Sequence, residues 1–103
     1  MTDTENDSDT LTDTDEKTSY YKMFKVIMHD DPKTTMDFVT AVLQRFFEKK
    51  VPDAVKLMIE IHESGSGLAG VYPYEGAEFR LEQVHSIARA AGFPLSCTME
   101  PDE

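Results

Sequence analysis

Three stretches of the sequence carry apolar residues spaced three and four positions apart, the spacing of one buried helix face. They cover residues 36–46, 54–61 and 77–91. Shorter apolar runs alternate with them: YYKMFKVIM before the first, LAGVYPY between the second and third, and FPLSCTM after the third. The order predicts an α+β fold class. We expect a small β-α-α-β-α-β sandwich with three helices packed on one face of a three-stranded antiparallel sheet.

Capping and breaking residues set the limits of these helices. Thr34 and Asp37 have capping-box spacing just before the first apolar stripe. Pro52 suits the first turn of the second helix, and the glycine-rich GSG at 65–67 stops it. Gly92 ends the third helix in the same way.

The composition changes at Tyr20. Residues 1–19 are almost all Asp, Glu, Thr and Ser, and such a segment buries too little apolar area to offset its chain entropy. We expect a disordered acidic N-terminal arm over 1–19, serving either solubility or partner contact, and one folded domain over 20–103.

Charge and cysteine content exclude several classes of protein. The net charge of -10 argues against nucleic-acid or anionic-membrane partners, which require a basic surface. The single cysteine, Cys97, rules out an internal disulfide and fits a reducing compartment. The sequence shows no signal-peptide pattern and no apolar run long enough to span a membrane. We therefore expect a cytoplasmic protein.

The residues give little support for catalysis. Cys97 has no base near it in sequence, and no GxGxxG, HExxH or CxxC motif occurs. Asp30 and Asp31 are adjacent acids in a turn, which are usually solvated. His29, with these aspartates and the distant His62, is a second candidate, for a mixed metal site, but the spacing matches no known metal motif. We expect no enzyme, no cofactor and no metal.

A pocket for another molecule is the remaining hypothesis. If the first two helices pack antiparallel, as their short connection indicates, the start of one meets the end of the other. A small apolar pocket would then form beside the Asp30/Asp31 turn, lined by Met36, Val39, Met58 and Ile61, with His62 next to it. Such a site suits a ligand with a cationic group and a hydrophobic side chain. The same apolar residues also fit a plain role in the core, and spacing alone does not separate these alternatives.

From about Phe24 to Pro101 the chain resembles the ClpS family of adaptors. The similarity is carried by KVIMHDDPKTTMDFV, VLQRFF, an A-x-x-x-M-x-x-x-H run ending at His62, GVYPYE and FPLSCTMEP, in the family's order and without gaps. The resemblance implies a monomeric, non-enzymatic adaptor. It would bind N-degron substrates, which begin with Leu, Phe, Tyr or Trp and have a free α-amino group. It would deliver them to a Clp AAA+ unfoldase (ClpA- or ClpC-like) and its protease, with the N-terminal arm entering the unfoldase.

The resemblance also implies roles for individual residues. Asp30, Asp31 and His62 would contact the substrate's α-amino group. The hydrophobic side-chain pocket would be lined by Thr34, Met36, Val39, Met58, Ile61 and Leu95. Met36 would act as a gate against first residues branched at Cβ.

Three positions depart from the family pattern. Asp30 stands where the family has Asn, Pro32 replaces an Asp, and Thr35 replaces a common Pro. An alternative reading is a protein-docking domain with the fold of the ribosomal stalk protein's C-terminal domain, without amine capture. A metal-dependent hydrolase built on the His/Asp cluster is the other rival.

Overall fold

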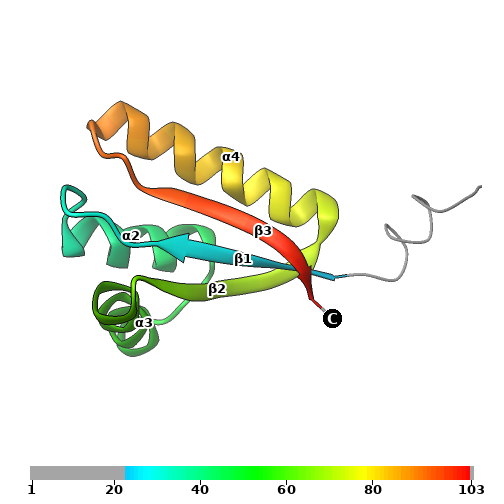
Figure 1. Cartoon of the computed structure of the whole chain (residues 1–103), viewed down its shortest axis with the longest axis horizontal. Helices are drawn as coiled ribbons and strands as arrows, with labels where there is room; N and C mark the ends of the chain where they lie inside the picture. Colours follow the sequence, from blue (N-terminus) through cyan, green and yellow to red (C-terminus); the bar gives the residue numbers. More distant parts are fainter. Residues whose placement is uncertain (1–22, 103) are drawn as a thin grey trace, which may run out of the picture.

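The computed structural model describes residues 23–102 (Figure 1). The predicted acidic arm therefore lies outside the described residues. The elements follow the predicted order: β1 (Met23–His29), α2 (Met36–Phe46), α3 (Val51–Ser64), β2 (Ser66–Pro73), α4 (Tyr74–Ala91) and β3 (Ser96–Asp102). The predicted β-α-α-β-α-β arrangement is confirmed.

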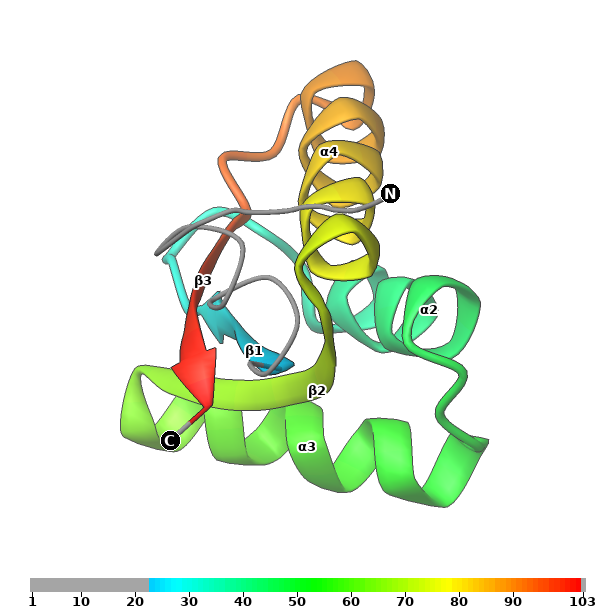
Figure 2. The ribbon, with the colours of Figure 1, turned by 90° about the vertical axis from the view of Figure 1, so that its right-hand side faces the viewer.

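The sheet has the strand order β2-β1-β3, and both neighbours of β1 run antiparallel to it. Along β1, Phe24, Val26 and Met28 are buried, while the residues between them are half-buried. This alternation leaves one sheet face for the helices. Figure 2 shows α4, α2 and α3 in an arc on that side of the sheet, as the sequence predicts.

Each helix contributes small or branched apolar residues to one core. Fully buried side chains include Leu43 of α2, Ile61 of α3 and Val84 of α4. Gly67 of β2 allows the strand to approach α3 closely, because a Cβ at this position would lie 2.7 Å from Cγ1 of Ile61. The strand thereby fixes the end of α3.

The ends of two elements differ from the predicted ones. β2 starts at Ser66, because only Gly65, with a left-handed φ of 95°, is needed to end α3. β3 starts at Ser96 rather than at Phe93. Phe93 instead packs edge-on against Phe38 of α2, with 4.9 Å between ring centroids, and closes that end of the core.

Candidate functional site

A cavity of about 560 Å³ opens where the turn after β1 meets the start of α2 and the end of α3. The turn supplies residues 30–35 to its lining, and the helices add Met36, Val39, Met58, Ile61 and His62. The two helix ends therefore do meet beside the acidic turn. Met36, Val39, Met58 and Ile61 all face this cavity, although Val39 and Ile61 also belong to the core.

The cavity has an apolar base and a methionine rim. Val39 and Ile61 are buried, with 7% and 1% of their surface exposed. Met58 is half-buried, and Met36, the first residue of α2, is 47% exposed. An incoming apolar group would therefore contact a rigid surface below and flexible thioether side chains at the entrance.

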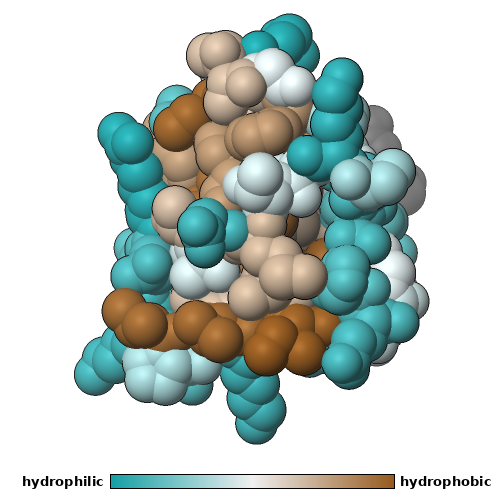
Figure 3. Space-filling model, turned by 90° about the vertical axis from the view of Figure 1, so that its left-hand side faces the viewer, coloured by the Kyte–Doolittle hydropathy of each residue, from teal (hydrophilic) through white to brown (hydrophobic). Residues whose placement is uncertain are grey.

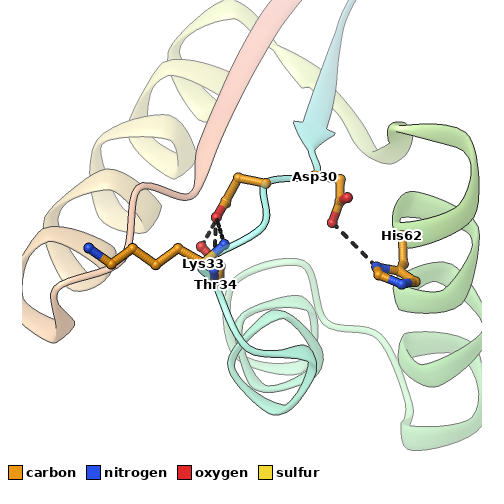
Figure 4. Close-up of polar contacts among 5 residues, drawn as sticks. Asp30, Lys33, Thr34 and His62 are labelled. Carbon is orange, nitrogen blue, oxygen red and sulfur yellow. Dashed lines mark hydrogen bonds and ion pairs between the residues drawn. The ribbon is translucent and has the colours of Figure 1, made fainter.

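Asp30 and His62 form the polar side of the cavity. The backbone N–H of Asp30 donates to the carbonyl of Gly65 at 2.9 Å, which ties the turn to the end of α3. The Asp30 Oδ1 then lies 3.7 Å from Nδ1 of His62 (Figure 4). At 33% and 55% exposure, respectively, the two side chains remain accessible to a ligand. A carboxylate and an imidazole so placed are suited to accept hydrogen bonds from one ammonium group.

Asp31 is engaged within the turn. Its Oδ1 accepts from the backbone N–H groups of Lys33 at 2.8 Å and Thr34 at 2.7 Å, and its Oδ2 accepts from the Thr34 hydroxyl at 2.7 Å (Figure 4). Burial raises the pKa of the Asp31 carboxyl, but these hydrogen bonds outweigh it, so that the pKa lies below its ordinary value. Asp31 therefore holds the shape of the loop that lines the cavity.

The N-cap of α2 is Thr35, not Thr34 as the sequence pattern suggested. The Thr35 hydroxyl accepts from the backbone N–H of Phe38 at 3.1 Å. Thr34 is bound to Asp31 instead, so the two adjacent threonines have different partners. This arrangement makes Met36 the first helical residue and places it at the cavity entrance.

Leu95 is the one predicted pocket residue that does not line the cavity. It is buried, with 4% exposed, and belongs to the core ahead of β3. Pro32, Lys33 and Thr35 line the cavity but had no place in the predicted set. These three residues line the cavity because every residue of the short turn between Asp30 and Met36 borders the opening.

Of the groups considered for catalysis or metal binding, Asp30 and His62 lie close together, but His29 and Cys97 have other partners. His29 lies on the sheet face opposite the helices, and its Nε2 contacts the Thr98 hydroxyl at 2.8 Å. Cys97 is buried, which raises the pKa of its thiol to about 12, and its backbone N–H donates to Nε2 of His85 at 3.0 Å. Within residues 23–102, no three His, Cys, Asp or Glu side chains are grouped to hold a metal ion. No helix in that range is long and apolar enough to cross a membrane.

The sequence matches the family model described as ATP-dependent Clp protease adaptor protein ClpS over residues 19–98. The chain belongs to the ClpS family. A ClpS relative from Desulfatibacillum aliphaticivorans is 53% identical over 94 residues, covering 91% of this chain and 90% of its own. One from Caulobacter vibrioides (strain NA1000 / CB15N) is 42% identical over 95 residues, covering 92% and 87%.

A solved ClpS structure has the same fold. Agrobacterium tumefaciens ClpS2 bound to L-phenylalaninamide superposes with a TM-score of 0.76 at 32% identity, over 79% of this chain and 98% of that one. These matches favour a ClpS adaptor over a stalk-protein-like docking domain.

Proposed function

We propose that this ClpS family member captures polypeptides by their first residue and delivers them to a Clp AAA+ unfoldase-protease. The observation that carries the proposal is the cavity, in which an apolar base of Val39 and Ile61 adjoins the Asp30–His62 pair. An N-terminal Leu, Phe, Tyr or Trp has both required parts, an apolar side chain and an α-ammonium. The Agrobacterium relative was solved with L-phenylalaninamide, which has both parts as well.

Each half of the site contributes a modest free energy. A hydrogen bond to a charged group is worth about 1.5–3 kcal/mol, and burial of a Leu or Phe side chain about 1.5–3 kcal/mol. Association entropy and desolvation of the ammonium oppose both terms. Useful affinity therefore requires both contacts in one ligand. An internal Phe has no ammonium, and an N-terminal Gly has no side chain to bury.

The lining of the cavity and the Asp30–His62 pair support the following residue roles. Asp30 and His62 accept from the α-ammonium, and Met36, Met58, Val39 and Ile61 surround the side chain, with Thr34 beside them. Asp31, which the resemblance assigns to the amine, acts through the turn that it organises. Leu95 supports the core rather than the ligand. No catalytic step or cofactor is part of this function.

The proposed partner is a ClpA- or ClpC-like unfoldase, and the proposed working form is a monomer. The proposed compartment is the cytoplasm, where a single buried thiol stays reduced. The acidic arm over 1–19 is proposed to enter the unfoldase during delivery.

Peptides that differ only in their first residue test the function. In a fluorescence anisotropy titration of the full chain, those starting with Phe, Leu, Tyr or Trp should bind at least tenfold more tightly than those starting with Gly or Ala. Equal affinities across the series would refute N-terminal residue capture.

The Met36→Ala variant is expected to accept first residues that the parent rejects. A residue branched at Cβ is widest next to its backbone, and we expect it to clash there with the exposed Met36 side chain, which lines the cavity. Peptides starting with Ile or Val should gain about tenfold in affinity, measured by the same titration. Met23→Ala is a matched control, because Met23 is similarly exposed, at 42%, but lies at the start of β1 and outside the cavity lining. If the variant still rejects Ile and Val as the parent does, Met36 is not a gate.

A further inference from the structure

Helix α3 carries a row of exposed apolar side chains beside the cavity. Val51, Val55 and Ile59 are 56%, 37% and 44% exposed. Residues four apart are neighbours along a helix surface, so the three follow one line. Figure 3 shows a hydrophobic row across the lower part of the face it draws, the part of the molecule where α3 lies in Figure 1. We call these three residues the α3 row.

The fold does not account for the α3 row. α3 packs on the core through Ala54 and Ile61, on another part of its circumference. Its remaining exposed flank is charged, with Asp53, Lys56 and Glu60 around a shallow hollow. The helix thus has one ordinary polar flank and one apolar flank, on a chain with a net charge of -10.

The α3 row is continuous with the cavity. Met58 follows Val55 by three positions, and His62 follows Ile59 by three, so each pair lies side by side on the helix surface. Met58 and His62 both line the cavity. An apolar surface therefore leads from the cavity toward the start of α3, and the row itself, from Val51 to Ile59, extends about 12 Å at roughly 1.5 Å per residue.

We propose that the α3 row binds the segment of the substrate that follows its captured first residue, and that it favours apolar side chains there. The inference rests on the proposed function, since the occupant is anchored at the cavity next to the row. An extended chain advances about 3.3 Å per residue, so roughly four residues cover the row. Because the first residue is anchored in the cavity, the substrate residues after it have a high effective concentration at the row. A weak contact there can therefore add to the overall affinity.

Two free peptides that both start with Phe test this inference on the full chain. One has Leu at positions 3 and 5 and the other has Ser there, with all other residues the same. The Leu peptide should bind about 3- to 10-fold more tightly by anisotropy. In the Val55→Thr/Ile59→Thr variant, the ratio of the two peptides' affinities should fall close to one. Leu68→Thr is the matched control and should leave the ratio unchanged. Leu68 of β2 is 44% exposed but lines the hollow beside the other, charged flank of α3.

The outcomes separate this inference from the proposed function. If the Ser peptide binds no better than its acetylated form, amine capture itself fails. If the Ser peptide is captured through its amine but the ratio is one in the parent, only the inference fails. The inference is overturned if the double variant keeps the affinity ratio but changes another property. Conversion of a dimer to a monomer in sedimentation would assign the row to a second copy of the chain. Loss of delivery alone would assign it to the unfoldase. Circular dichroism confirms that the variant is folded.

Discussion

Replacing His62 by alanine is expected to weaken binding of a Phe-starting peptide about 10- to 150-fold while the domain stays folded. The factor corresponds to the loss of one hydrogen bond to a charged group, worth about 1.5–3 kcal/mol. His62 is 55% exposed near the end of α3, so its removal leaves no cavity in the core. Isothermal titration calorimetry gives the affinity, and thermal unfolding checks the fold.

Glu63→Ala is the control for this variant. Glu63 is the next residue, is exposed and does not line the cavity. Its removal changes the local charge but no proposed ligand contact, so the affinity should stay within about twofold. An unchanged affinity in His62→Ala, or an equal loss in Glu63→Ala, would contradict the assignment of His62 to the amine.

Asp31→Ala is expected to lower both the stability and the affinity, whereas Asp31→Asn should retain most of both. Alanine removes all three acceptor contacts of the turn, which should reduce the free energy of unfolding by about 1–3 kcal/mol and let residues 30–36 move away from the cavity. The Asn carbonyl still accepts from the two backbone N–H groups, and its amide N–H₂ can donate to the Thr34 hydroxyl. Urea unfolding and peptide titration of both variants give the comparison.

The same pair of variants distinguishes a role in the turn from direct contact with the amine. If the charge of Asp31 acts on the α-ammonium, Asp31→Asn should lose as much affinity as Asp31→Ala without losing stability. That pattern would restore the role implied by the family resemblance.

Acid should remove the contribution of Asp31 to stability. Its hydrogen bonds hold the pKa of the folded carboxyl below its usual value. The stabilisation is therefore fully present above the unfolded pKa of about 3.9, and it is lost as the pH falls through the lower folded value. The stability difference between parent and Asp31→Ala should accordingly shrink below about pH 4 in urea titrations.

The order of elements and the cavity could be predicted from the sequence, because both depend on apolar spacing and on one short connection. Met36 and Ile61 illustrate this: each belongs to a helix stripe, and the short link between the helices brings the stripe ends together. Apolar content alone misplaced the start of β3, since Phe93 and Leu95 resemble strand residues but pack into the core after the turn at Gly92.

The finer geometry of the site depends on which of several equivalent groups form a contact. Thr34 and Thr35 are both placed to cap α2, and the choice follows from Asp31, which engages Thr34. The role of Asp31 could not be predicted for the same reason. The sequence shows an acidic residue in a turn, but it does not show whether the carboxylate oxygens face the ligand or the N–H groups of the turn. The exposure of Val55 beside the cavity likewise appears only once α3 is packed on its neighbours.

The central claim is that one ligand fills the apolar base and the Asp30–His62 side of the cavity together. Four peptides test it most directly: a first residue of Phe or Gly, each with a free or an acetylated α-amino group, titrated against the full chain near pH 7. Only the free Phe peptide should bind measurably, with at least tenfold loss on acetylation. Equal binding of the free and acetylated Phe peptides would contradict the claim.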